Sequence, residues 1–78
     1  MRLICQKGVH DVPYCNCVVI RDGNYIYASV GEMPECLLAK YSSKEKAEKA
    51  LKKMREAHAH FEVMHVDGIF QFPQDSEV

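Results

Sequence analysis

With 78 residues, the chain has room for one small domain and not for a second hydrophobic core. Its 10 Lys and Arg residues nearly balance its 11 Asp and Glu residues, and a net charge of −1 argues against a protein that coats DNA or RNA. No run approaches the roughly 20 apolar residues of a membrane span, and no apolar run of signal-peptide type follows Met1. We therefore expect a cytoplasmic protein without a membrane span or a signal peptide, with its four cysteines as reduced thiols.

Strand-like runs account for most of the sequence outside the predicted helix. Such runs alternate apolar and polar residues or collect β-branched ones, and turn-forming residues bound them. They are residues 2–6, 9–12, 15–21, 24–30, 36–41 and 69–72. Pro13 makes the second run an unlikely central strand. Asp22-Gly23 is a pair favoured in tight hairpin turns, so the fourth run should return antiparallel to the third.

The third run, residues 15–21, is the most strand-like segment because Val18, Val19 and Ile20 follow one another. Its apolar residues would occupy both faces of a strand. This pattern indicates a central strand, or a strand that a partner subunit covers. We therefore expect the chain to form a homodimer.

One long amphipathic helix is predicted at about residues 43–60. Ser42 and Glu45 form an S-x-x-E capping box, in which each side chain can accept a hydrogen bond from the other residue's backbone N–H. Apolar residues then recur at i, i+3, i+4 and i+7 spacing, which gives one stripe along the helix. The stripe consists of Ala47, Ala50, Leu51, Met54, Ala57, His58 and Phe61.

Several short strands with one helix predict an α+β fold in a single domain over residues 1–78. We expect a small antiparallel sheet of about four to five strands, with the long helix packed on one face. The second face of the sheet would then be solvated or buried in the dimer. Residues 74–78 are predicted to be a polar, acidic tail.

Tyrosines on a sheet can stack a nucleobase, and neighbouring cationic side chains can hold a phosphate. Tyr25 and Tyr27 would share one face of their strand, with Arg21 and Lys40 in neighbouring strand positions. These four residues are the candidate ligand-binding set. Packing or a dimer interface would account for the tyrosines at least as well.

The predicted helix also carries a basic surplus, with six Lys or Arg against three Glu between Lys44 and Glu56. A lysine-rich face can bind phosphates, and its candidate residues are Lys46, Lys49, Lys52 and Lys53. No aromatic side chain interleaves with these lysines, and i, i+4 pairs such as Glu45 with Lys49 and Glu48 with Lys52 should neutralise part of the face. Nucleic acid is therefore the less favoured partner.

Cys15 and Cys17 would share one face of a strand, which makes a zinc site conceivable. Their spacing is poor for zinc, because structural sites usually pair ligands two to four residues apart in two clusters. No local arrangement selects a nucleophile with its base, and no Gly-rich phosphate loop is present. We expect a non-enzymatic protein without a metal or a cofactor.

Both ends of the sequence resemble a group of small uncharacterised proteins of gut Firmicutes and their phages and prophages. The resemblance covers roughly half of the chain: a start of MRLI-Q-G type, a DVPY segment, the helix entry, and an FQFP end with an acidic Glu-Val tail. The matching segments are residues 1–8, 11–14, 38–47 and 70–78. Cys5, Lys7 and the Cys15-Asn16-Cys17 stretch depart from the pattern. The resemblance implies a mobile-element protein of the bacterial cytoplasm, and it carries no activity across.

A small phage-type protein without catalytic machinery most often acts by binding. The leading interpretation is interference with host defence, either by binding a host protein or by sequestering a nucleotide immune signal. One alternative is a nucleic-acid-associated regulator that uses the basic helix face. Another is a small metal- or thiol-responsive protein that uses Cys15 and Cys17.

Overall fold

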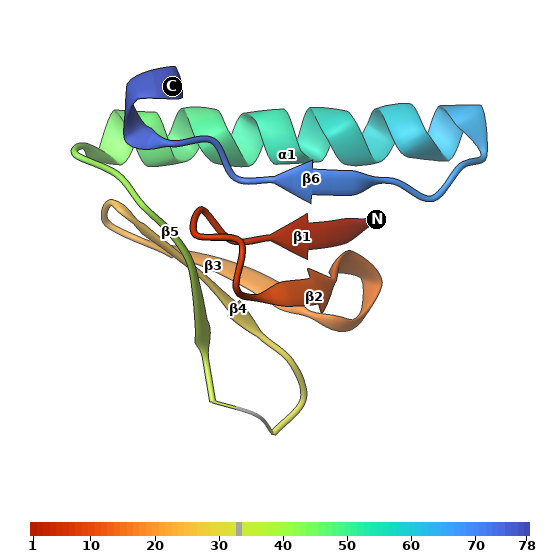
Figure 1. The fold of residues 1–78 in the computed structure, drawn as a ribbon, viewed down its shortest axis with the longest axis horizontal. Coiled ribbons are helices and arrows are strands. Elements are labelled where there is room, and N and C mark those ends of the chain that lie inside the picture. Colours follow the sequence, from red (N-terminus) through yellow and green to blue (C-terminus); the bar gives the residue numbers. More distant parts are fainter. Residues whose placement is uncertain (33) are drawn as a thin grey trace.

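The computed structural model describes residues 1–32 and 34–78. Within these residues it has one long helix and six strands in two three-stranded sheets, which confirms the α+β class (Figure 1). The elements in chain order are β1 (Arg2–Ile4), β2 (Asp11–Pro13), η1 (Tyr14–Asn16), β3 (Val18–Asp22), β4 (Tyr25–Ser29), β5 (Cys36–Lys40), α1 (Lys44–Met64), β6 (Ile69–Gln71) and η2 (Asp75–Glu77), where η marks a single 3-10 turn.

Helix α1 begins one residue later than its predicted capping box. The side chain of Ser43, not Ser42, accepts the hydrogen bond from the backbone N–H of Lys46, at 3.2 Å. The backbone N–H of Ser42 instead donates to the Asp75 carboxylate at 2.7 Å. The helix also runs past residue 60, because no Gly or Pro interrupts it before His65 ends it in the left-handed conformation, with φ of 55°.

The buried stripe of α1 is built from small and flexible residues, namely Ala47, Ala50, Leu51 and Met54. Alanines let the strands approach the helix closely, and burying the larger side chains contributes about 1.5–3 kcal/mol each. The core is completed by apolar residues from both sheets and from the C-terminal segment: Leu3, Cys5, Ile26, Ala28, Leu38, Ala39, Tyr41 and Phe72. The predicted amphipathic helix thus packs as expected, and no described helix is long and apolar enough to cross a membrane.

The first sheet has the order β3–β4–β5 and is antiparallel throughout. Asp22 pairs with Tyr25, so the hairpin loop is Gly23-Asn24, and Gly23 supplies the positive φ of 60° that the turn requires. Strand β3 lies at the edge of this sheet and not at its centre. Its side chains alternate between exposed and half-buried, so the run of three β-branched residues has one outward and one inward side.

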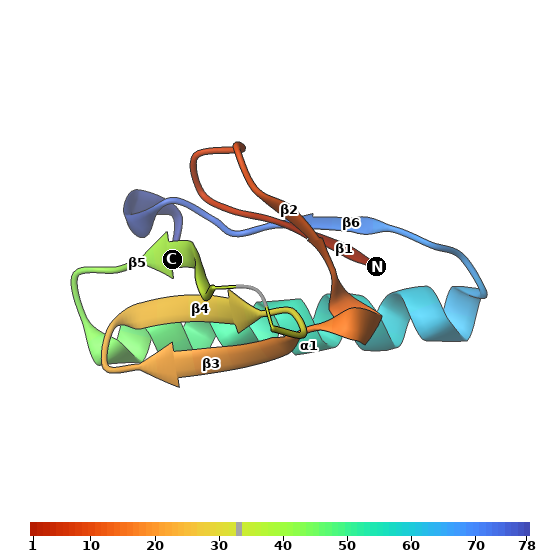
Figure 2. The same ribbon diagram turned by 90° about the horizontal axis from the view of Figure 1, so that it is seen from below.

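The second sheet has the order β2–β1–β6, and β1 pairs with β6 in parallel. The expected single antiparallel sheet of four to five strands is therefore two sheets with one parallel pair. The reason is that α1 carries the chain from β5 across the molecule before β6 returns along β1 (Figure 1). In Figure 2, β3 and β4 lie along α1, with β1, β2 and β6 to one side of them.

Gln6 joins the two sheets and the C-terminal segment. Its backbone N–H donates to Leu38 of β5 at 2.9 Å, and its side chain accepts from the backbone N–H of Lys40 at 2.8 Å. Its amide group also donates to the carbonyl of Pro73 at 2.9 Å, and the hydroxyl of Tyr41 donates to the same carbonyl at 2.9 Å. The predicted polar tail is thus anchored on the domain.

Candidate functional site

The outward side of the β3–β4–β5 sheet carries an apolar surface, which we call the sheet face. It consists of Val18, Ile20, Asp22, Tyr25, Tyr27, Leu37 and Lys40. Residues two apart on a strand share a side, which places the β3 and β4 members together. On β5 the pairing shifts by one residue, as in a β-bulge, so that Leu37 and Lys40 both stay exposed while Leu38 and Ala39 are buried.

Large apolar side chains of the sheet face stand in solvent. Val18 is 63% exposed, Ile20 is 36% exposed and Leu37 is 43% exposed, whereas Ile26 and Ala28 on the other side of the sheet are buried. Isolated apolar residues on a surface are ordinary, but a contiguous set on one sheet marks an interaction surface. Val18 and Ile20, the outward apolar residues of the third run, therefore belong to a face that the described residues leave uncovered.

Tyr25, Tyr27 and Lys40 form the centre and one corner of the sheet face. The two tyrosine rings are stacked with centroids 6.2 Å apart, and the Lys40 ammonium nitrogen lies 5.6 Å from the centre of the Tyr25 ring. A cation at that distance from an aromatic face is attracted to it. Strand pairing sets Asp22 on one side of Tyr25 and Lys40 on the other, so one row across the sheet runs acid, aromatic, base.

Arg21 does not belong to this surface. It pairs with Ile26 and shares the inward side, where its guanidinium group donates to the carbonyl of Gly23 at 2.9 Å and lies 3.8 Å from the Glu48 carboxylate. The four predicted ligand residues are therefore divided, with three of them together and Arg21 turned toward α1. Alternation along residues 20–22, once the hairpin register is known, would have revealed this.

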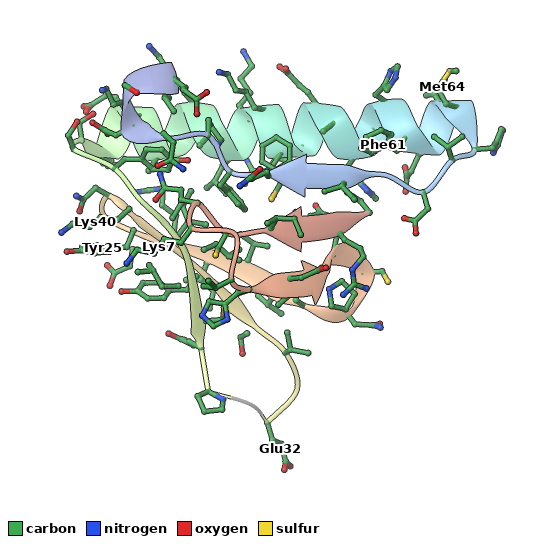
Figure 3. All side chains as sticks on the ribbon, viewed as in Figure 1. Lys7, Tyr25, Glu32, Lys40, Phe61 and Met64 are labelled. Atoms are coloured by element: carbon green, nitrogen blue, oxygen red, sulfur yellow. The ribbon has the colours of Figure 1, made fainter. Side chains whose placement is uncertain are left out.

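A second concave feature adjoins the sheet face, and we call it the hollow. It has a volume of about 340 Å³ and lies between residues 5–10 and strand β5. Its lining consists of Cys5, Gln6, Lys7, Val9, His10, Leu37, Leu38, Ala39 and Lys40. Two lysines and a histidine thus surround a largely apolar floor, and Figure 3 shows Lys7 and Lys40 at the same end of the molecule as Tyr25.

Comparison of the chain with protein-family models, with curated proteins and with solved structures found no match.

The thiol of Cys5 lies at the loop end of the hollow and is almost completely buried. Burial raises the pKa of this thiol, but hydrogen bonding from the backbone N–H groups of His10, Val9, Lys7 and Gly8 outweighs burial and leaves the pKa below its ordinary value. The His10 N–H is 3.3 Å from the sulfur. The Gly8 N–H donates to the Cys5 carbonyl at 3.0 Å, so the loop folds closely around Cys5 at this end of the hollow.

The basic residues of α1 do not form one free patch. The ammonium group of Lys46 is held by Asp75, with its nitrogen 3.0 Å from the backbone carbonyl and 3.4 Å from the carboxylate. Lys49, Lys52 and Lys53 are exposed, and the exposed Glu48 and Glu56 flank them along the helix. Glu48 contacts Arg21 and not Lys52, so the expected i, i+4 pair gives way to a contact between helix and sheet.

Cys15 and Cys17 lie in and just after the turn η1, with Cys15 exposed and Cys17 half-buried. Cys17 donates to the carbonyl of Tyr14 at 3.6 Å, and burial with the nearby Cys15 raises its pKa. Within the described residues, no group of three or more His, Cys, Asp or Glu side chains could hold a metal ion.

Proposed function

We propose that this chain is a non-enzymatic binding protein that acts as a homodimer, with the sheet face of one copy packed on the sheet face of the other. The observation that carries the proposal is the exposure of Val18, Ile20 and Leu37 beside two stacked tyrosines on one sheet. Sheets that pack face to face bury such surfaces at a spacing of about 10 Å. A chain of 78 residues also gains stability from association, because alone it buries a smaller fraction of its surface than a larger domain does.

The charges on the sheet face select a second copy as its occupant. In a symmetric dimer the same surface must complement itself. A two-fold axis parallel to β4 places β3 of one copy over β5 of the other, so Lys40 faces the partner's Asp22 and Asp22 faces the partner's Lys40. Within the described part of the chain, neither the Asp22 carboxylate nor the Lys40 ammonium group makes an ion pair. Both are therefore available to a partner.

The same axis also brings apolar groups together. Strand pairing aligns Ile20, Tyr27 and Leu37 in one row across the sheet. In the dimer Ile20 then lies over the partner's Leu37, and the Tyr27 rings of the two copies meet at the axis. Tyrosine at the centre of an interface combines a large apolar area with a hydroxyl group that reaches the rim.

The resemblance of both chain ends to phage- and prophage-type proteins supports a role against host defence. In this role the dimer binds a host protein or holds a nucleotide signal. No metal or cofactor enters the mechanism, because binding alone withdraws the target. A plating assay tests this part: expression in bacteria that carry a defence system should restore phage growth, and a lack of effect across a panel of such systems would remove the anti-defence role.

Sedimentation velocity over a range of concentrations tests the dimer. The wild type should sediment at twice the chain mass of 8.9 kDa, and Leu37→Glu should sediment as a monomer. Val63→Glu is the matched control, because Val63 is 75% exposed but lies on α1, outside the sheet face. A wild type that stays monomeric at every concentration would refute the dimer.

A charge exchange tests the orientation of the axis. Lys40→Asp places two carboxylates opposite each other at both ends of the interface and should weaken the dimer. Adding Asp22→Lys restores opposite charges and should recover it. If the double variant fails to form the dimer while Leu37→Glu is still monomeric, the sheet face remains the interface but this orientation of the axis is wrong.

A further inference from the structure

The hollow is a second site, formed within one chain, and it lies beyond the dimer contact proposed above. Its volume of about 340 Å³ falls in the range of small-ligand pockets, at the lower end. The residues given above as its lining include Lys7, His10 and Lys40 but no Asp or Glu. The floor is apolar, with Leu37, Leu38 and Ala39 of β5 contributing to it.

The walls of the hollow are held in place by hydrogen bonds. Gln6 is fixed by contacts to Leu38, Lys40 and Pro73, and these connect the loop to β5 and to the C-terminal segment. Residues 5–10 also close on themselves, because the backbone N–H of Cys5 donates to the carbonyl of His10 at 3.1 Å. A cavity whose walls are already fixed loses little conformational entropy when a ligand enters.

Two independent features give the hollow a positive potential. One is the pair of ammonium groups of Lys7 and Lys40 around the opening, where the imidazole of His10 can add a hydrogen bond. The other is the backbone around Cys5, where the His10 N–H donates to the sulfur over an N–S distance of 3.3 Å and neighbouring backbone N–H groups lower the pKa of the thiol. Backbone N–H groups turned toward one point make an anion-binding concavity.

We infer that the hollow binds a small organic phosphate, with the phosphate between Lys7 and His10 and the organic group on the apolar floor. The size of the hollow suits a mononucleotide and not a longer nucleic acid. Lys40 stands at the border between the hollow and the sheet face, so a bound phosphate and the partner's Asp22 both lie near its charge. The ligand site itself needs no residue from the partner.

Titration calorimetry of the full chain with adenosine monophosphate, inorganic phosphate and adenosine tests this inference. The monophosphate should bind more tightly than either fragment, since it uses both the charged rim and the apolar floor. Lys7→Gln should weaken its binding roughly 10-fold or more, as expected for the loss of a charge-assisted hydrogen bond. Lys52→Gln, an exposed change on α1 outside the hollow, should leave binding unchanged.

Amide spectra locate the ligand. Saturation with the monophosphate should shift the backbone N–H signals of residues 7–10 and of β5, and Lys7→Gln combined with His10→Gln should abolish the shifts. Equal affinity for inorganic phosphate would overturn the organic part of the inference and leave a free-anion site. No binding of the monophosphate, or binding that survives the double change, would overturn the site altogether.

The test of ligand binding in the hollow can fail independently of the test of the dimer. Sedimentation of Lys7→Gln should still show the dimer, because Lys7 lies outside the sheet face. A dimer without ligand binding would refute the hollow alone, and ligand binding by a monomer would refute the dimer alone.

Discussion

The aromatic ring of Phe61 lies directly against Gly68, in the space that a β-carbon at position 68 would need. Gly68 begins the return from α1 toward β6, and its backbone carbonyl accepts from the N–H of Arg2 at 2.9 Å. Gly68→Ala must push either the ring or the backbone aside, so we expect a loss of about 1–3 kcal/mol in the free energy of unfolding, measured by urea denaturation.

The control for this contact is a double-mutant cycle. In a Phe61→Leu background the ring is absent, and Gly68→Ala should then cost much less than it does alone. Gly23→Ala provides a second comparison, because a β-carbon there meets no neighbouring atom and only its positive φ is unfavourable. An equal cost of Gly68→Ala with and without the ring would show that the contact does not limit stability.

Tyr41 makes the fold sensitive to alkaline pH. Burial raises the pKa of its phenol to about 12, above the value of about 10 in an unfolded chain. The stabilisation is therefore complete below pH 10 and is lost as the pH rises toward 12, because only the unfolded chain ionises in that window. Tyr41→Phe should flatten this alkaline decline in the free energy of unfolding. At neutral pH the variant should be less stable than the wild type by about 1 kcal/mol, because it lacks the hydrogen bond to the Pro73 carbonyl.

The matched control for Tyr41 is Phe70→Leu, which removes a half-buried aromatic ring packed against the core but no phenol. It should leave the alkaline decline as steep as in the wild type. An unaltered decline in Tyr41→Phe would mean that this phenol ionises freely in the folded state.

The thiols should ionise in a definite order. Backbone N–H groups hold the pKa of Cys5 below its ordinary value, whereas burial raises the pKa of Cys36, with a smaller contribution from the charge of Cys5. Ultraviolet absorbance of the thiolate in variants that retain one cysteine each should therefore rise at lower pH for Cys5 than for Cys36. The reverse order would contradict the proposed geometry of residues 5–10.

Asp75 links acid stability to the C-terminal turn. The backbone N–H of Ser42 and the ammonium group of Lys46 lower the pKa of this carboxyl. A carboxyl with a lowered pKa stabilises the fold at pH values above the ordinary pKa of aspartate. This stabilisation is lost as the pH falls through the folded-state pKa. Asp75→Asn should reduce the acid sensitivity of unfolding, and Glu32→Gln at the loop tip after β4 (Figure 3) should leave it unchanged.

Local patterns in the sequence were enough for the helix and the first hairpin. The apolar spacing of Ala47, Ala50, Leu51 and Met54 predicts the buried stripe of α1, because each signal lies within one element. Asp22-Gly23 likewise marks the turn between β3 and β4. Neighbouring serines compete for the same cap, however, and Asp75, far along the chain, decides between Ser42 and Ser43.

Local patterns could not predict features that depend on pairing between segments far apart in the sequence. The parallel contact of β1 with β6 and the division into two sheets follow from where α1 returns the chain. The sequence grouped Arg21 with the tyrosines because the register was unknown, and its side chain lies on the other side of the sheet. Lys40 lies over the Tyr25 ring, and Tyr25 and Tyr27 share one side. The hollow had only a weak local signal, the Lys7-Gly8 turn, because β5 supplies its other wall.

The bond between Gln6 and Pro73 joins residues 67 positions apart, and β6 completes the sheet begun by β1. A ribosome releases the N-terminal strand first and the C-terminal segment last. The domain therefore cannot close before residues 69–73 have left the ribosome, and until then its unpaired apolar strands stay open to chaperones and proteases. Closure of each new copy should thus be a single late step that brings β1 and Gln6 together with β6 and Pro73.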